Sequence, residues 1–192
     1  MDHCGGMTPD WHTIIDKHYP AGRRVRGILL SHSRSVADEA LAIARRLNLP
    51  LTDEEIECAA MLHDIGIIAT DAPGIDCHGD KPYLCHGAVG ADMLRADGVD
   101  EKYARVAERH TGSGLTADEI AAAGLPLPGG RAYMPETLLE KLICYADCFF
   151  SKGGDGSRKS LERVEASMAK FGSGVLRRFL ELRGMFPENE AF

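Results

Sequence analysis

Ala59-Ala60-Met61-Leu62-His63-Asp64-Ile65-Gly66 is the stretch of sequence that decides the fold. It is an apolar helical run that ends in an adjacent histidine and aspartate, and a glycine follows after one isoleucine. An imidazole and a carboxylate at the end of such a segment are costly to bury without partners. A metal ion offsets that cost, because it accepts a neutral histidine nitrogen and an anionic carboxylate oxygen together. The pair therefore predicts a metal site that needs further ligands elsewhere in the chain.

The composition indicates one acidic domain. The chain has 192 residues and a formal net charge of -7. This length suits a single domain with a sizeable core, and the negative charge argues against a general surface for nucleic acid or anionic membranes. Residues 1–9 lack the basic and apolar regions of a signal peptide, and no apolar run reaches a membrane-spanning length. We therefore expect a cytoplasmic protein that binds neither nucleic acid nor membrane.

The chain contains 6 cysteines, but none of them forms a Cys-x-x-Cys pair. Cys144 and Cys148 are four residues apart on an expected helix, and Cys58 lies in an alanine-rich helical run. We interpret the cysteines as small packing residues in a reducing compartment. Cys77-His78 and Cys85-His86 form a looser pattern, for which zinc binding is the alternative reading, although structural zinc sites generally have tighter paired spacing.

The hydrophobic periodicity predicts an all-α fold, with almost no period-two alternation. We divide the chain into an N-terminal helical extension (1–22), a helical domain (23–152) and C-terminal helices that pack on that domain (153–192). The expected helices cover residues 10–18, 23–47, 52–64, 86–97, 100–110, a short segment after Thr116, 135–152 and one or two further segments, with capping boxes at Thr52 and Thr116 and Pro135 in a first turn. Residues 66–85 and 125–130 read as irregular connections, and long ordered loops are often functional.

More imidazoles and carboxylates lie on the apolar faces of these expected helices. Taken singly, a buried histidine more often makes a hydrogen bond within the protein, and a lone aspartate such as Asp147 has a Lys or Arg partner about as often as a metal. Taken together, four imidazoles and two carboxylates that project into one core predict a pair of divalent metals bridged by Asp64. The six residues are His32, His63, Asp64, His86, His110 and Asp147. The other histidines, His3, His12, His18 and His78, read as surface or loop residues.

The order of these six residues resembles the HD-domain superfamily of metal-dependent phosphohydrolases, and Leu62-His63-Asp64-Ile65-Gly66 matches its HDIG subgroup. The resemblance extends over about residues 25–152 and includes His86–Ala91, Glu108–Thr116 and Glu140–Asp147. It implies a single helical bundle with a dinuclear metal site in its core. One metal would be held by His32, His63, Asp64 and Asp147, and the second by Asp64, His86 and His110.

At a finer level, the chain is similar to an uncharacterised branch of HDIG-domain proteins. It also resembles the bacterial HD-domain symmetrical diadenosine tetraphosphatases, which share the motif order and a comparable His-Thr-x-Gly segment, here His110-Thr111-Gly112-Ser113-Gly114. Two segments depart from the phosphatase pattern, namely the loop at residues 66–85 and Leu125-Pro126-Leu127-Pro128. These departures suggest a different substrate pocket.

The resemblance implies hydrolysis of a phosphate ester or phosphoanhydride, in a nucleotide or a related phosphorylated metabolite, by a hydroxide that the metals activate. Iron or manganese suits the histidine and carboxylate ligands best, with magnesium, nickel, cobalt and zinc as alternatives. Asp64 and His63 are the central catalytic candidates. Cationic side chains next to expected ligands, Arg109 and Lys141, would clamp the phosphate. The loop residues Lys81, Thr111 and Ser113 are candidates for substrate binding.

Two other functions remain open at this point. Some HD-domain proteins use the same ligand set for a mixed-valence di-iron centre that activates oxygen. A non-catalytic module that senses a metal or a nucleotide is the third reading, and the complete ligand set argues against it. The helical spacing of residues 157–192 is equally compatible with a cover for the core and with a homodimer surface.

Overall fold

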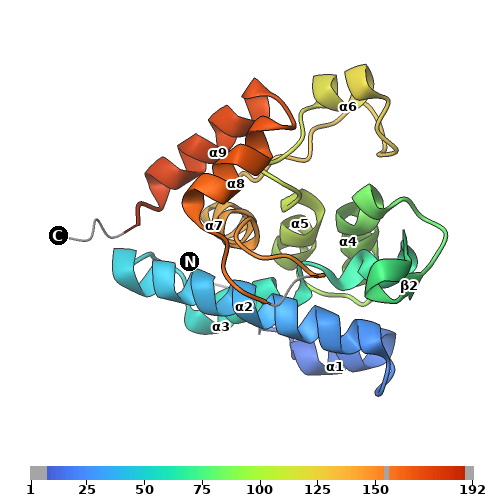
Figure 1. Ribbon diagram of the computed structural model, residues 1–192. Helices are drawn as coiled ribbons and strands as arrows, with labels where there is room; N and C mark the ends of the chain where they lie inside the picture. Colours follow the sequence, from blue (N-terminus) through green and yellow to red (C-terminus); the bar gives the residue numbers. More distant parts are fainter. Residues whose placement is uncertain (1–7, 154–155, 189–192) are drawn as a thin grey trace, which may run out of the picture.

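The computed structural model describes residues 8–153 and 156–188, where nearly all regular structure is helical (Figure 1). The predicted all-α bundle is thereby confirmed. The α-helices of the described residues are α1 (Trp11–His18), α2 (Arg24–Leu47), α3 (Asp53–Leu62), α4 (His86–Ala96), α5 (Glu101–Arg109), α6 (Ala117–Ala123), α7 (Leu138–Asp147), α8 (Leu161–Ala169) and α9 (Ser173–Met185). Within this part of the chain, none of the helices combines the length and the apolar composition that crossing a bilayer requires.

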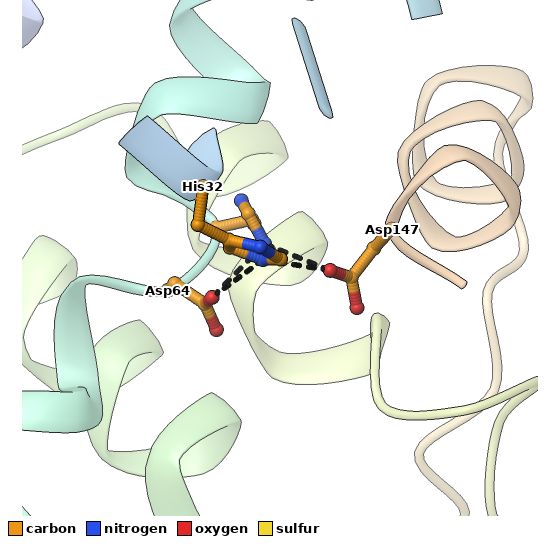
Figure 2. Close-up of side chains that lie close together, drawn as sticks. His32, Asp64 and Asp147 are labelled. Atoms are coloured by element: carbon orange, nitrogen blue, oxygen red, sulfur yellow. Dashed lines mark ion pairs between the residues drawn. The ribbon is translucent and has the colours of Figure 1, made fainter. Parts of the chain in front are cut away.

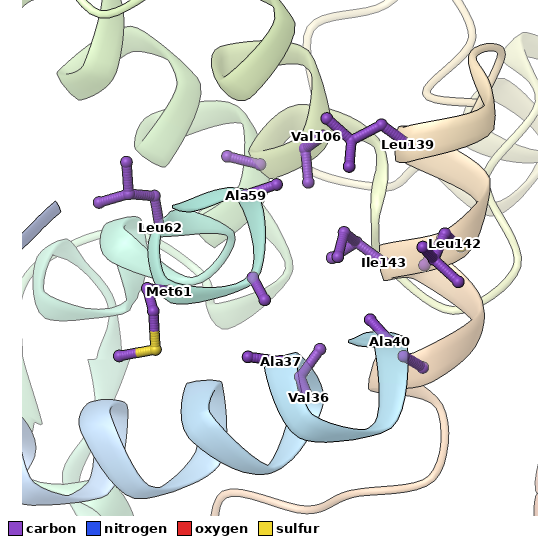
Figure 3. Packing of buried hydrophobic residues seen from close by; sticks show 14 of the residues in the cluster. Val36, Ala37, Ala40, Ala59, Met61, Leu62, Val106, Leu139, Leu142 and Ile143 are labelled. Atoms are coloured by element: carbon purple, nitrogen blue, oxygen red, sulfur yellow. The ribbon is translucent and has the colours of Figure 1, made fainter. Parts of the chain in front are cut away.

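The core lies between α2, α3, α5 and α7. The long helix α2 packs along both α3 and α7, and Figure 3 shows Ala37 and Ala40 on the side of α2 that faces these helices, with Ala59 on α3 and Ile143 on α7. All four side chains are fully buried. Because three of them are alanines, the helix backbones approach closely and leave the larger apolar residues to fill the layers between them. The same buried cluster continues from α1 to α9, so the terminal helices share one core with the central ones.

Local sequence signals set most of the helix ends. The capping boxes at Thr52 with Glu55 and at Thr116 with Glu119 both form, as predicted. Helix α2 ends at Leu47, and its C-cap Asn48 adopts a left-handed conformation with φ 51°.

The helix expected over residues 135–152 is shorter than predicted at both ends. Thr137 accepts a hydrogen bond from the Glu140 amide and acts as the N-cap, so α7 begins at Leu138. Pro135 lies outside it. The helix ends at Asp147, and this early end directs the following residues back across the bundle.

The segment predicted to be an irregular loop, residues 66–85, has short regular structure. It contains three 3-10 turns, η1 (Ile65–Ala69), η2 (Pro73–Ile75) and η3 (Tyr83–Cys85), and two antiparallel strands, β1 (Asp71–Ala72) and β2 (Cys77–His78). Each strand has two residues, so no alternation of apolar and polar residues could reveal it. Asp76, with φ 62°, makes the turn that reverses the chain between them.

Candidate metal centre

The six predicted ligands converge because most of them lie at ends of helices that meet in the core. His63 is the C-cap of α3 and Asp64 precedes η1 directly. His86 is the first residue of α4, His110 is the C-cap of α5, and Asp147 is the last residue of α7. His32 alone comes from the middle of a helix, where it faces inward from α2. Five separate segments of the sequence therefore supply the side chains of one cluster.

The first group of candidate ligands surrounds one oxygen of Asp64. His32 Nε2 lies 2.9 Å from Asp147 Oδ1 and 3.1 Å from Asp64 Oδ2. Figure 2 marks both ion pairs with dashed lines. His63 Nε2 lies 3.2 Å from the same Asp64 oxygen and 3.5 Å from Asp147 Oδ1. The ligand atoms of these four residues lie within 4.8 Å of one another, which suits a single metal ion.

The second group surrounds the other oxygen of the same aspartate. Asp64 Oδ1 lies 3.2 Å from His110 Nε2 and 3.4 Å from His86 Nε2. The two histidine Nε2 atoms are 3.0 Å apart. Asp64 thus belongs to both groups and presents a different oxygen to each, which is the arrangement expected of a carboxylate that bridges two metal ions.

Three of the histidines are oriented in the same way by a backbone carbonyl of the preceding turn. The Nδ1 atoms of His63, His86 and His110 each lie within hydrogen-bonding distance of the carbonyl oxygen three residues earlier, namely that of Ala60 (2.6 Å), Tyr83 (2.7 Å) and Ala107 (2.8 Å). An Nδ1–H group that donates to a carbonyl fixes the tautomer and leaves the Nε2 lone pair free for a metal. The backbone therefore prepares all three rings as ligands through Nε2.

The residues of the cluster fit a metal ion, because their polar atoms are buried and incompletely satisfied by the protein. His32 Nε2, His63 Nε2 and both carboxylate oxygens of Asp64 lack a hydrogen bond of good geometry within the described part of the chain. Asp64 and His63 are inaccessible to solvent. Buried polar groups are nearly always paired, and ligation by divalent cations would satisfy these atoms together.

The charged groups of the cluster shift one another's pKa values. Burial disfavours the charged form of His63, but the carboxylates of Asp64 and Asp147 outweigh this effect and raise the pKa of His63 to about 10. Burial lowers the pKa of His86 to about 3. Burial alone would raise the pKa of Asp64, yet the charges of His63 and Lys152 hold it well below the ordinary value. In the absence of metal, protons and Lys152 supply the positive charge that the two carboxylates require.

Lys152 is the site residue that the sequence did not reveal. Its Nζ lies 2.8 Å from Asp64 Oδ2, and its side chain is 13% exposed. Burial alone would lower the pKa of Lys152, but Asp64 and Asp147 outweigh it and raise this pKa. The ammonium group also lies 5.7 Å from the ring centre of Tyr83. A protonated lysine therefore stands beside the carboxylate shared by the two groups of ligands.

The backbone around Asp64 is held by two close contacts. Tyr19, which follows α1, is fully buried; its hydroxyl donates to the carbonyl of Ile65 and accepts from the Ile68 amide. Gly66 lies against α4: a Cβ atom there would be 2.1 Å from the carbonyl oxygen of His86 and 2.4 Å from the amide nitrogen of Gly90. The glycine after the His-Asp-Ile sequence is thus required for η1 to approach α4, which carries His86.

The two predicted phosphate-clamping residues, Arg109 and Lys141, differ in how the structure places them. Arg109 precedes His110, but its guanidinium pairs with Glu136 (2.8 Å) and Glu140 (3.3 Å) rather than with the carboxylates of the cluster. Lys141 lies on α7 six residues before Asp147, and this spacing puts the two side chains on different faces of the helix. Arg109 contributes to an ion-pair network that joins α5 to the segment before α7 and to α7 itself.

The predicted substrate-binding residues are divided between two places. Thr111 and Ser113 line a cavity that also contacts Asp147, although the Ser113 hydroxyl already donates to the carbonyl of Val175. Lys81 is exposed and pairs with Asp80 at 3.4 Å. Its backbone pairs with Ala69 and Asp71, so this residue supports the hairpin loop.

Among the described residues, the cysteines and the remaining histidines stay outside both groups of candidate ligands. The described cysteines, Cys58, Cys77, Cys85, Cys144 and Cys148, are buried and free, in agreement with their interpretation as packing residues. His18 pairs with Asp97 at 2.6 Å, and His78 lies 3.2 Å from Asp76. His12 stacks on Trp11, and His3 lies outside the described residues.

The sequence matches the HD domain family over residues 29–150, and the chain therefore belongs to this family. It is 34% identical over 166 residues to the tRNA (cytidine(56)-2'-O)-methyltransferase of Thermoplasma volcanium, a match that covers 86% of this chain and 43% of the relative. The protein of the same name from Picrophilus torridus is 32% identical over 120 residues, which cover 62% of this chain and 30% of the relative.

A third relative, an uncharacterised protein of Methanocaldococcus jannaschii, is 36% identical over 122 residues, which cover 62% of this chain and 64% of that protein. The chain thus spans less than half the length of the two named methyltransferases. None of these three relatives carries the name of a diadenosine tetraphosphatase, so they do not support that finer resemblance. No solved structure matches the chain.

Proposed function

We propose that this HD-domain protein is a metal-dependent phosphohydrolase that cleaves a phosphate ester or phosphoanhydride of a small molecule. The observation that carries the proposal is Asp64, whose two oxygens face two separate groups of histidines while Lys152 stands beside it. Two divalent ions held by these groups would polarise phosphoryl oxygens and lower the pKa of a water molecule. Iron or manganese suits this ligand set.

Side chains of the protein would supply the remaining chemistry. Lys152 and Asp147 line a cavity of about 420 Å³ together with Tyr83 and Phe150. A phosphoryl group in this cavity would lie within reach of the ammonium group of Lys152, which would bind a phosphoryl oxygen and balance the charge that develops there. The histidines keep Nε2 directed at the cluster because the helix carbonyls hold Nδ1. The buried position of Asp64 excludes bulk water from the carboxylate and strengthens these interactions.

The names of the relatives suggest a second candidate, methyl transfer to tRNA. The match to the Thermoplasma volcanium protein covers 86% of this chain but only 43% of that protein. We assign metal-dependent chemistry to the shared portion, since the HD domain lies there, and methyl transfer to the rest of that relative. Incubation of the chain with tRNA and labelled S-adenosylmethionine tests this division, and transfer of label to tRNA would overturn it.

The central experiment combines metal analysis with a screen of phosphorylated metabolites that includes nucleotides and diadenosine polyphosphates. We expect about two divalent ions per chain and metal-dependent release of phosphate. The variant Asp64→Asn preserves side-chain size but weakens both groups of ligands, so we expect loss of both ions and loss of phosphate release. His110→Gln affects the second group alone and should retain about one ion. His78→Gln, at an exposed histidine, is the matched control.

The outcomes separate the candidate functions. Full phosphate release by Asp64→Asn would exclude the dinuclear hydrolase. Oxygen consumption by the iron-loaded protein, without phosphate release, would identify the di-iron oxygenase instead. Stable binding of metal and nucleotide without turnover of either kind would favour the sensing module.

A further inference from the structure

A larger cavity extends from Asp147 away from the cluster. Its volume is about 780 Å³, and it is lined by residues of the loop at 111–115, of α6 and of the C-terminal helices α8 and α9. Tyr83, Asp147 and Phe150 line this cavity and also the smaller cavity beside Lys152. The larger cavity therefore adjoins the place proposed for the phosphoryl group, and a ligand of ordinary metabolite size can occupy both.

The wall of the larger cavity is mainly apolar. Aliphatic, thioether and aromatic side chains from separate elements form it: Leu84, Leu115, Leu125, Met168, Phe171 and Val175. Phe171 is 74% exposed, the largest value among the exposed large hydrophobic residues of the described chain. The apolar part of a ligand in this cavity would contact the exposed ring of Phe171.

Three of the polar side chains in this wall are already engaged by the protein, while the hydroxyls of Thr111 and Ser167 also line it. The Ser113 hydroxyl donates to the Val175 carbonyl, and Glu119 accepts from Arg178 at 2.8 Å. Lys159 Nζ donates to the carbonyls of Cys148 (3.1 Å) and Phe150 (2.9 Å). A nucleobase is recognised through the hydrogen-bonding edge of its ring, and two hydroxyl groups in a mainly apolar wall provide little for such an edge. Burial of apolar surface is therefore the main source of affinity for a ligand in this cavity.

Building on the proposed phosphohydrolase activity, we propose that the substrate is a phosphate ester whose organic part is an apolar chain or ring held in this cavity, rather than a nucleoside. The phosphoryl group would lie beside Lys152 and the ligand cluster. The organic part would pass Tyr83 and Phe150 and contact the six apolar residues named above. This assignment narrows the substrate class, which the cluster alone leaves open.

Binding to the metal-loaded protein tests the assignment without turnover. Calorimetry compares methylphosphonate, hexylphosphonate and the phosphonate analogue of AMP at equal metal concentration. Each buried methylene contributes about fourfold in affinity, so we expect hexylphosphonate to bind at least about tenfold more tightly than methylphosphonate and more tightly than the AMP analogue.

Two variants on α6 locate the binding. Ala123 lines the cavity, whereas Ala121 does not, and both are exposed on the same short helix. Ala123→Phe fills part of the cavity and should reduce the affinity for hexylphosphonate while leaving that for methylphosphonate unchanged. Ala121→Phe is the matched control and should affect neither.

The possible results also distinguish this inference from the proposed function. If methylphosphonate binds but hexylphosphonate binds no better, the apolar class of substrate is excluded and the phosphoryl site stands. Tighter binding of the AMP analogue, or equal effects of the two alanine substitutions, would likewise overturn the inference. If none of the phosphonates binds the metal-loaded protein, the phosphohydrolase proposal itself fails.

Discussion

Asp64 and Lys152 form a buried pair whose roles differ. Asp64 is shared by the two groups of ligands, whereas Lys152 contacts the Asp64 oxygen that faces the first group. A metal ion held by the first group would compete with the ammonium group for the negative charge of Asp64. We therefore expect Lys152 to interact with phosphoryl oxygens when the cluster holds metal, and to act as the counter-charge when it does not.

Replacement of Lys152 separates these roles. Lys152→Met keeps the length and the apolar stem but removes the charge, so we expect kcat/KM for phosphate release to fall about tenfold to a hundredfold, as for the loss of one charged hydrogen bond. Metal content should remain unchanged, because no ligand is removed. The exposed Lys170→Met is the control. An unaltered kcat/KM at full metal occupancy would contradict the role proposed for Lys152.

The sequence predicted the six metal-ligating candidates but not Lys152, and the reason is local. Histidines and aspartates on apolar helix faces are conspicuous because their burial is costly. The sequence predicts a helix that runs to residue 152, with Lys152 at its end. In the structure α7 ends at Asp147, and the chain then turns back toward Asp64. Because the predicted end of this helix lies five residues too late, the sequence does not reveal Lys152 as a residue of the site.

At the scale of elements, the approach of η1 to α4 sets the second group of ligands. Gly66 and Gly90 face each other where these elements pack, and α4 carries His86. Gly66→Ala would place a methyl group 2.1 Å from the His86 carbonyl oxygen, so the two elements must separate. We expect a loss of at least about 3 kcal/mol in the free energy of unfolding, as for severe overpacking.

The control for this prediction is Gly74→Ala. An added Cβ at Gly74 would meet nothing within 4 Å, and its φ is not in the left-handed region, so the expected change is within about 1 kcal/mol. Denaturant unfolding of both variants provides the measurement. Equal stability of the two variants would show that η1 and α4 are not in close contact.

Some ends of helices and strands can be predicted from the sequence, and others cannot. The ends marked by a side-chain cap, such as Thr52 and Thr116, were predicted because the capping box is a local signal. The same logic applies to Thr137, but Pro135 offered a competing start. The sequence does not predict the hairpin β1–β2, because the pairing of its strands depends on contacts that no periodic pattern marks. The neighbouring bridge between Thr70 and Lys81 is of the same kind.

At the scale of the whole molecule, the cluster joins segments that are far apart in the sequence. His32 and Asp147 are separated by more than a hundred residues, yet His32 Nε2 and Asp147 Oδ1 lie 2.9 Å apart. An unfolded chain cannot hold these groups together, so metal binding must favour the folded state. The sequence predicted this convergence because all six polar side chains lie on helix faces that are otherwise apolar. The larger cavity could not be predicted, because it depends on how α6, α8 and α9 pack against the bundle, and no local pattern specifies that packing.

Metal binding should therefore stabilise the entire domain and not one loop. With Mn²⁺ at about a hundredfold excess over its dissociation constant, linkage predicts a gain of about 2.7 kcal/mol in the free energy of unfolding for one ion. A chelator should reverse this gain, and Asp64→Asn should abolish it, because both ligand groups share that carboxylate. Urea unfolding followed by far-ultraviolet circular dichroism measures the effect over all helices at once. If Mn²⁺ stabilised Asp64→Asn as much as the native chain, the ion would bind elsewhere and the cluster would lose its role as the metal site.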